Sequence, residues 1–407
     1  MEFVEKRAKE LYISSSGLSK PADQFGYGYP FLPYSIVFHN YYIPDTLTTL
    51  VNSTSKDRET CSIKRGDVFL TRTSETTEEL GMSCVALQDY ANATFNGFAK
   101  RLRPITDEII PEYAAYFFRS PFFRAQCMSM ASLITRASLN DGMIGRFRIR
   151  YPKSKADQMK VGTMLMNYDK LIEANNKRIK VLEQMAENLY REWFVRFRFP
   201  GHESISLENG IPKGWTINRI EDIGSVVGGG TPSTEHPEYW DGDIPWLTPA
   251  DLASFSDVYI SSGSSFITKD GLKSSSTKML PKDTVLLSSR APIGYVAIAK
   301  NKICTNQGFK NVICDTNKVV PLYLFYFFKS NKDLLECYAS GSTFLELSGG
   351  RLKKIKLIVP PIEIQELFVE RIGACLDQTE VINRVSQQLI RQRDLLLPRL
   401  MTGKLEV

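Results

Sequence analysis

An uninterrupted heptad pattern near the middle of the chain is the sequence feature that most restricts the fold. Between residues 155 and 197, apolar side chains recur at alternating steps of four and three, with charged residues elsewhere. A helix of about 40 residues would be about 60 Å long, which is longer than most helices of single globular domains. The pattern therefore predicts a coiled-coil helix between globular regions; the simpler alternative is a long amphipathic helix packed on one core. The seam residues are Leu165, Tyr168, Ile172, Asn175, Ile179, Leu182 and Leu189.

The rest of the chain contains an internal repeat, shifted by roughly half the chain length. PEYAAYFFRS at 111–120 matches PLYLFYFFKS at 321–330, and IKRGDVFLTRTSE at 63–75 matches LPKDTVLLSSRAP at 280–292. Shorter matches pair Pro30-Phe31-Leu32 with Pro245-Trp246-Leu247, Asn96-Gly97-Phe98 with Gln307-Gly308-Phe309, and 142–152 with 350–360. Because the matches are collinear, they predict a duplicated chain.

The repeat also predicts a second long helix, from about residue 362 to 397. Its seam residues are Phe368, Ile372, Ile382 and Leu389. Two helices with apolar seams bury them most simply against each other, so we expect an antiparallel coiled coil with a pseudo-twofold axis. Each globular unit mixes β-rich runs with one aromatic helix, which is an α+β pattern. The expected divisions are 1–152 (first unit), 153–199 (central helix), 200–212 (linker), 213–360 (second unit) and 361–407 (C-terminal helix and tail).

Composition excludes several classes of protein. The 407 residues carry a formal net charge of +6, which fits a polyanionic partner. The sequence contains no run of about 18 apolar residues, so we expect no membrane span. The charged N-terminus lacks the apolar centre of a signal peptide, so we expect a cytoplasmic protein with no membrane contact. The seven cysteines are scattered and predict neither disulfides nor a zinc site.

No catalytic motif is present in the sequence. The glycine-rich run at 228–231 lacks the lysine of a nucleotide-binding loop, and the signatures HExxH, GxSxG and the EF-hand loop do not occur. No metal site is predicted. We therefore expect that the chain is not an enzyme.

Three features favour nucleic-acid binding. Basic residues cluster at corresponding places in the two units, for example around Arg101 and Lys310, although such runs are often only solvated surface. Loops rich in Gly, Ser, Thr, Asn and Gln adjoin these clusters, and such side chains can read base edges in the major groove. Two related units on paired helices suit half-sites that recur along a duplex.

These residues resemble a known family, the specificity subunits of Type I restriction–modification systems. The resemblance covers essentially the whole chain. GIPKGWTINRIEDIGSVVGGGTPST at 210–234 looks like the start of such a subunit's second target-recognition domain. Later landmarks of that domain are similar to SSRAPIGYVAI at 288–298, TNQGF at 305–309 and LKKIKLIVPPIEIQ at 352–365. The end of the family's central helix region is similar to LYREWFVRFRFPG at 189–201, and its C-terminal tail is similar to RDLLLPRLMTGKLEV at 393–407.

The resemblance implies a non-catalytic subunit that reads a bipartite double-stranded DNA target. Each globular unit would be a target-recognition domain for one half of the target. The coiled coil would space the units and dock two methyltransferase subunits, and the restriction complex would add motor–nuclease subunits. The chain itself would bind no cofactor, because S-adenosylmethionine, ATP and Mg²⁺ would belong to its partners.

The resemblance also suggests DNA-contacting residues. In the second unit these are Thr231, Thr248, Arg290, Asn306, Gln307, Lys310, Ser342 and Thr343. The first unit departs from the family landmarks, with FNGF at 95–98 where the second has NQGF. Its candidates are Lys20, Arg72, Asn96, Lys100, Arg101 and Arg136.

Two other functions remain open from the residues alone. The chain could be a coiled-coil scaffold that binds proteins without reading bases, and loss of site-specific methylation on its deletion would argue against that. It could also be an enzyme without a recognisable motif, such as a nuclease, which metal-dependent cleavage by the isolated chain would reveal.

Overall fold

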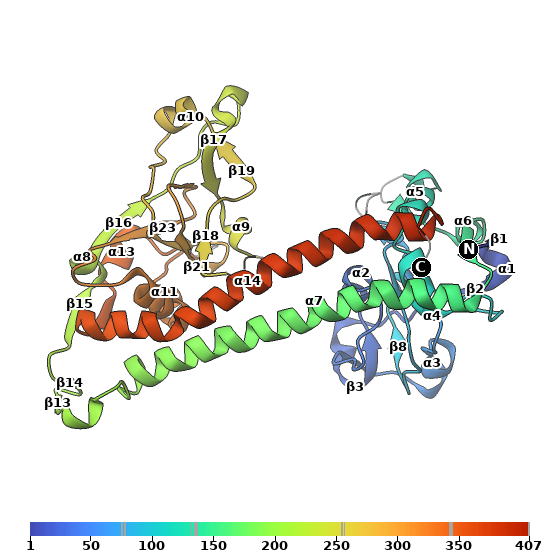
Figure 1. Ribbon diagram of the computed structural model, residues 1–407, viewed down its shortest axis with the longest axis horizontal. Coiled ribbons are helices and arrows are strands. Elements are labelled where there is room, and N and C mark those ends of the chain that lie inside the picture. Colours follow the sequence, from blue (N-terminus) through green and yellow to red (C-terminus); the bar gives the residue numbers. More distant parts are fainter. Residues whose placement is uncertain are drawn as a thin grey trace. The chain divides into compact units, whose positions relative to one another are not determined.

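The computed structural model describes residues 1–74, 76, 79–130, 132–133, 137–253, 255, 257–341 and 345–405. The chain divides into two compact units (Figure 1). The first consists of Met1–Ala174 and Val385–Val407, and the second of Asn175–Arg384. Each unit therefore contains one globular region and a part of each long helix.

The main sheet has the same strand order in both units. In the first unit all neighbours are antiparallel, in the order β2 (Tyr12–Ser16), β9 (Ala99–Pro104), β5 (Val68–Thr71), β7 (Ser83–Val85). In the second unit the order is β16 (Gly224–Gly228), β23 (Lys310–Cys314), β20 (Val285–Ser289), β21 (Ile293–Ala299), β18 (Tyr259–Ile260). The strand β18, parallel to β21, extends the second sheet by one.

A smaller three-stranded sheet also recurs. Its orders are β4 (Leu50–Val51), β3 (Phe25–Leu32), β8 (Thr94–Phe95) and β19 (Ser265–Ile267), β17 (Trp240–Leu247), β22 (Cys304–Thr305). The long strand carries a register shift at the same place in both units, between Phe25 and Tyr29 and between Trp240 and Ile244. In Figure 1, β17 and β19 lie with α10 (Lys269–Ser274) at the end of the second unit farthest from its helix segments.

A two-stranded ribbon closes each repeat. It pairs β1 (Phe3–Arg7) with β12 (Arg148–Pro152) in the first unit, and β15 (Thr216–Arg219) with β24 (Lys356–Val359) in the second. A short helix adjoins each strand of the ribbon: α1 (Ala8–Leu11) and α6 (Asp141–Ile144), then α8 (Ile220–Ile223) and α13 (Gly349–Lys353). Both ribbons are antiparallel, so the first and last strands of each globular region meet.

Further short elements connect these sheets. In the first unit they are η1 (Ala22–Gln24), α2 (Tyr34–His39), α3 (Ser55–Thr60), β6 (Thr73–Ser74), α5 (Pro121–Met130), β10 (Ser132–Leu133) and β11 (Ala137–Ser138). In the second unit they are η3 (His202–Ser204), η4 (Pro237–Tyr239), α9 (Pro249–Ala253) and α12 (Lys332–Cys337). The predicted linker contains a small hairpin, β13 (Leu207–Glu208) and β14 (Ile211–Pro212), which turns at Asn209-Gly210, both with positive φ.

The aromatic helices occupy the cores, as their sequences predict. These helices are α4 (Pro111–Phe117) and α11 (Pro321–Ser330), and each begins with a proline, which suits the first helical turn. The Tyr113 hydroxyl donates to Arg150 O at 3.0 Å, and Tyr323 donates in the same way to Ile358 O. The core helix is thereby fixed to the ribbon in both units.

The long helices are α7 (Lys155–Tyr190), which continues into a π-helical turn η2 (Arg191–Val195), and α14 (Ile362–Met401). In the second unit Arg178 approaches Gln378 at 3.4 Å and the Tyr190 ring packs against Phe368, so the two helices are antiparallel there. Six predicted seam residues are buried: Leu165, Ile179, Leu182, Phe368, Ile372 and Ile382. The other five are half-buried: Tyr168, Ile172, Asn175, Leu189 and Leu389.

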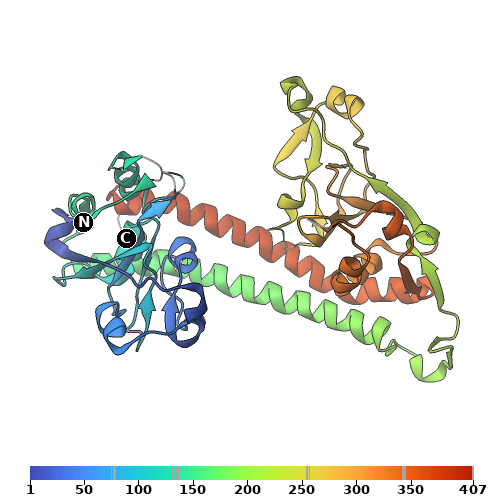
Figure 2. The same cartoon turned by 180° about the vertical axis from the view of Figure 1, so that it is seen from behind.

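The second long helix extends past its predicted end at residue 397. It includes Pro398 and ends at Met401. A proline removes one helical N–H group, but Leu397, Leu400 and Met401 are buried in the apolar core of the first unit, and this packing holds the last turn. Both chain termini lie in this unit (Figure 2), where Gly403 packs closely against the Phe3 ring. The predicted fold class, duplicated α+β units with long packed helices, is confirmed.

Candidate nucleic-acid interface

The turn before β23 presents several of the predicted second-unit residues. The Asn306 main-chain N–H donates to Leu247 O at 2.8 Å, and the Gly230 N–H donates to Thr305 O at 2.9 Å. The Asn306 side-chain oxygen accepts from the Gly308 N–H at 2.8 Å, a local bond typical of asparagine in turns. Asn306 therefore holds the turn, and Gln307 is exposed next to it.

Two basic side chains meet beside this turn around Glu346. Lys310 Nζ lies 3.3 Å from Glu346 Oε1 and 3.2 Å from Gln307 O, while Arg290 lies 3.7 Å from Glu346 Oε2. The Arg290 side chain keeps 40% of its exposure and that of Lys310 keeps 16%. The fold thus brings Arg290 next to Gln307 and Lys310, which belong to one turn, and Glu346 joins them from a third segment.

Two predicted threonines flank this group. The exposed Thr231 donates its hydroxyl hydrogen bond to the Gln307 side-chain oxygen. The hydroxyl and main-chain N–H of Thr248 both donate to Asp251 Oδ2, at 2.8 and 2.7 Å. Thr248 directly precedes α9, and these two bonds fix the start of that helix. The Thr248 hydroxyl therefore already donates its hydrogen bond within the protein.

The first unit contains the same turn, in a register that corrects the sequence match. The Asn96 N–H donates to Leu32 O at 3.1 Å, and its side-chain oxygen accepts from the Phe98 N–H at 2.7 Å. Asn96 is therefore the counterpart of Asn306, and the predicted match with Gln307 is wrong by one residue. Gly97 takes the place of Gln307, because a Cβ atom there would lie 2.2 Å from Ser19 Oγ.

Lys100, the counterpart of Lys310, also pairs with a carboxylate. Its ammonium lies 2.8 Å from Asp141 Oδ1, and the Ser14 hydroxyl donates to the same carboxylate at 2.7 Å. The hydrogen bond from Lys100 is the main reason that the pKa of Asp141 lies below its ordinary value. Arg72 is half-buried near this pair, and Lys20 forms an ion pair with Asp57 at 3.0 Å.

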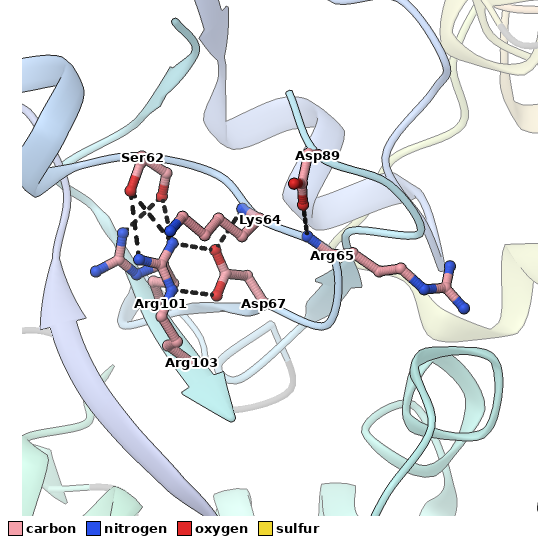
Figure 3. Close-up of polar contacts among 7 residues, drawn as sticks. All are labelled: Ser62, Lys64, Arg65, Asp67, Asp89, Arg101 and Arg103. Atoms are coloured by element: carbon pink, nitrogen blue, oxygen red, sulfur yellow. Dashed lines mark hydrogen bonds and ion pairs between the residues drawn. The ribbon is translucent and has the colours of Figure 1, made fainter. Parts of the chain in front are cut away.

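Arg101 is buried within the first unit and takes part in a polar cluster (Figure 3). Its guanidinium donates to Ser62 O at 2.6 Å, and the neighbouring Arg103 forms two hydrogen bonds with the buried Asp67, at 2.8 and 2.7 Å. Burial lowers the pKa of Arg101, with the positive charge of Arg103 as a second cause. With 7% of its surface exposed, Arg101 supports β9 from inside the unit.

Three predicted contact residues, Arg136, Ser342 and Thr343, lie outside the described residues. Within the part of the chain that the structure describes, no three His, Cys, Asp or Glu side chains are placed to share a metal ion. No helix in that part is both long and apolar enough to cross a membrane. All seven cysteines are free thiols, and four of them are buried.

Sequence reasoning missed three residues of this interface. Glu346 and Asp141 hold the paired lysines, and Phe98 keeps 57% of its surface exposed at the first-unit turn. An alignment of the two repeats anchored on Asn96 and Asn306 would have brought Phe98 opposite Gly308 and so drawn attention to it. The two carboxylates carry no such signal, because their pairing depends on the tertiary fold.

Comparison with known families gives a match over most of the chain. The family described as "Type I restriction modification DNA specificity domain" matches twice, at residues 2–184 and 212–391. The two matches cover the two repeats found in the sequence and in the fold.

Individual relatives agree with this match. The Type I restriction enzyme MjaIX specificity subunit of Methanocaldococcus jannaschii is 43% identical over 208 residues, which is 49% of this chain and 48% of the relative, so the match spans about half the length of that protein. The HindI specificity subunit of Haemophilus influenzae is 22% identical over 84% of this chain and 87% of its own. The crystal structure of an S subunit from M. genitalium has a TM-score of 0.56 at 12% identity, over 98% of this chain and 96% of that chain, which shows a common fold.

Proposed function

The chain belongs to the family of Type I restriction modification DNA specificity proteins, and on this premise we propose that it reads a bipartite duplex DNA target, one half with each unit. The observation that carries the proposal is the turn shared by the two units. The same backbone bonds hold both turns, whereas the side chains that the turns present differ. A common scaffold with different exposed side chains suits two units that read different sequences.

In the second unit, Arg290, Gln307 and Lys310 are the proposed centre of recognition. An arginine can form paired hydrogen bonds with guanine and a glutamine with adenine, whereas a lysine suits guanine or a phosphate. Glu346 keeps Arg290 and Lys310 close to Gln307 before DNA arrives. Thr231, Thr248 and Asn306 support these side chains or contact the backbone of the target.

In the first unit, the proposed contacts are Lys20, Arg72 and Asn96, whereas Lys100, with 6% of its surface exposed, is proposed to hold the turn through its ion pair with Asp141. Lys100 and Lys20 are held by carboxylates, as Lys310 is in the second unit. Because Arg101 is buried and bonded to Ser62, its proposed role is to support β9 rather than to touch bases.

The partners and the lack of catalysis form part of the same proposal. The packed helices α7 and α14 would dock two methyltransferase subunits, and a restricting complex would add motor–nuclease subunits. S-adenosylmethionine, ATP and Mg²⁺ would be bound by those partners, and this chain would catalyse no step. Metal-dependent DNA cleavage by the isolated chain would contradict this.

Methylation in cells is the direct test of the proposed function. The methylated sites of a genome would be mapped with and without the gene for this chain. We expect one split sequence motif to lose methylation when the gene is deleted. Unchanged methylation would instead favour a protein-binding scaffold that reads no bases.

A single substitution tests how the work is divided between the units. Arg290→Ala should relax the base choice in only one half of the motif, by about 1–3 kcal/mol of discrimination at one position. Lys282→Ala is the matched control, because it removes an exposed positive charge from a turn of the same unit. Relaxed choice in both halves, or in neither, would count against the assignment of one half-site to each unit.

A further inference from the structure

A basic groove lies where β1 meets α1 in the first unit. Its lining includes four cationic side chains, Arg7, Lys9, Arg146 and Arg148. Arg148 points outward on β12, where it alternates with the buried Ile149, and Arg146 is exposed in the turn that precedes the buried Phe147. The local fold therefore gathers positive charge on one face.

This arrangement places like charges opposite each other. Arg7 and Arg148 are direct partners across the antiparallel ribbon, an arrangement that lowers strand stability. Arg148 is partly compensated by Glu5 at 3.3 Å. Across the described ranges, no carboxylate forms an ion pair with Arg7, Lys9 or Arg146. Three of the four cations that line the groove therefore have no ion-pair partner among the described residues.

The second unit repeats the arrangement at the equivalent place. Arg219 and Lys356 are direct partners across β15 and β24, and Lys354 takes the position of Arg146. The backbone is the same, since the Ala8 N–H donates to Phe147 O at 2.8 Å and the Ile220 N–H donates to Ile355 O at 3.0 Å. Arg219, Lys354 and Lys356 are all exposed, and Arg219 lies 3.4 Å from the Glu221 carboxylate. The repulsive cross-strand pair is therefore present in both repeats.

In each unit a short helix beside the ribbon, α6 or α13, contacts the lysine of the candidate interface. Asp141 lines the first-unit groove and also binds Lys100. In the second unit, Gly349, at the start of α13, packs against the Lys310 side chain. The ribbons are therefore connected to the proposed recognition turns through α6 and α13.

Shared and divergent features suit different parts of a DNA target. The phosphate backbone is the same in every sequence, whereas the base edges differ. We propose that the cations at the ribbons, Arg7 and Arg146 in the first unit and Arg219 and Lys354 in the second, are matched contacts to DNA phosphates that position each unit on its half-site. This inference rests on the proposed function, and it adds a sequence-independent binding site to each recognition unit.

Salt dependence of DNA affinity tests the inference. The full chain, purified with any modification subunits that accompany it, would be titrated with a duplex bearing the methylated motif and with a scrambled duplex, over a range of KCl concentrations. Log affinity falls linearly with log salt concentration, and each lost phosphate contact makes this slope less steep by about 0.9. Two double variants are tested: Arg7→Gln with Arg146→Gln, and Arg219→Gln with Lys354→Gln. Each should make the slope less steep by about 2, and each should leave the preference for the motif unchanged.

Two controls accompany these variants. Lys213→Gln removes an exposed charge next to the linker hairpin and should leave the slope as it is. Arg7→Lys keeps the charge and should retain most of the slope, which separates loss of charge from damage to the fold.

Each contrary result has a distinct meaning. An unchanged slope in the double variants overturns the inference, and so does a changed preference between the two duplexes. Loss of the accompanying subunits at an unchanged slope would assign the ribbons to a protein partner, again against it. If the unsubstituted chain itself fails to prefer the motif, the proposed function fails, whatever the slopes are.

Discussion

Two glutamines show at the level of single residues how closely the units correspond. Gln158 accepts from the Ile110 N–H at 2.9 Å and donates to the carbonyls of Glu108 and Pro152, both at 2.8 Å. Gln365 accepts from the Val320 N–H at 2.9 Å and donates to Lys318 O and Pro360 O, at 3.0 and 2.8 Å. Each buried side chain connects the start of a long helix to the segment that precedes the core helix.

Removing either amide should destabilise its own unit. Gln158→Leu or Gln365→Leu leaves a buried N–H and carbonyl groups without partners, and each such group costs about 1–3 kcal/mol. We expect a loss of about 3 kcal/mol in the free energy of unfolding, measured by urea denaturation. Gln184→Leu, at an exposed position of α7, should change stability by less than about 0.5 kcal/mol. A similar loss in all three variants would contradict the role assigned to the bonds.

Asp141 gives the first unit a predictable response to acid. Its pKa is lowered chiefly by the hydrogen bond from Lys100, so the ionised form is favoured in the folded state. Its contribution to stability is therefore present above the unfolded-state pKa of about 3.9 and is lost as the pH falls through the lower folded-state value.

Asp141→Asn should consequently be less stable than the parent chain near neutral pH. The difference should shrink as the pH is lowered from about 5 towards 2, because the parent then loses the same charge. Denaturation at several pH values measures this, and Glu59→Gln, at an exposed position of α3, serves as the control. A difference that grows in acid would mean that the carboxylate does not stabilise the fold through its charge.

At the level of elements, a buried polar network joins three helices in the first unit. Asp169 on α7 accepts from the Tyr116 hydroxyl on α4 and forms an ion pair with Arg393 on α14. The Arg393 guanidinium also lies over the Tyr41 ring, 4.9 Å from its centroid. In the second unit, Lys329 on α11 pairs instead with Glu187 on α7 at 3.0 Å. The helices are thus connected by different charges at related places.

Breaking this network on one side should cost more than replacing it. Asp169→Leu leaves the largely buried Arg393 guanidinium with the exposed Asp394 as its remaining ion-pair partner, and we expect a loss of about 3 kcal/mol of stability. The double variant Asp169→Leu with Arg393→Met should recover part of that loss, because no buried charge remains and the carboxylate of Asp394 is exposed to water. Urea denaturation of the single and double variants gives the coupling energy. If the double variant lost as much free energy of unfolding as the two single variants lose together, the two side chains would not interact directly.

For the whole molecule, charge predicts how DNA affinity depends on salt. The chain has a net charge of +6 and exposes cations beside both candidate interfaces. If about 6–10 phosphates are neutralised, affinity should fall by about 10³–10⁵ between 50 and 200 mM salt, since bound counterions are released. Titration of labelled duplex at several salt concentrations measures this. An affinity independent of salt would contradict binding to the DNA backbone.

Much of the fold could be predicted because the repeat preserves local patterns. Pro30-Phe31-Leu32 and Pro245-Trp246-Leu247 lie at the same place in equivalent bulged strands, and the aromatic runs form the expected core helices. The turn residues were harder to predict, since similarity of Gly-Phe pairs aligned Asn96 with Gln307. The side-chain bond that makes Asn96 equivalent to Asn306 is a property of the folded turn.

The sequence by itself determined the duplication, the two long helices and the absence of recognisable catalytic motifs, because periodicity and local chemistry are written in neighbouring residues. Only the tertiary structure decided which charges are available at the surface. Arg101 is buried because the Ser62 carbonyl, nearly 40 residues away, accepts a hydrogen bond from its guanidinium, whereas Arg7 and Arg148 are exposed on a ribbon whose strands come from opposite ends of the repeat. Such pairings join segments distant in the chain, so no local pattern can reveal them.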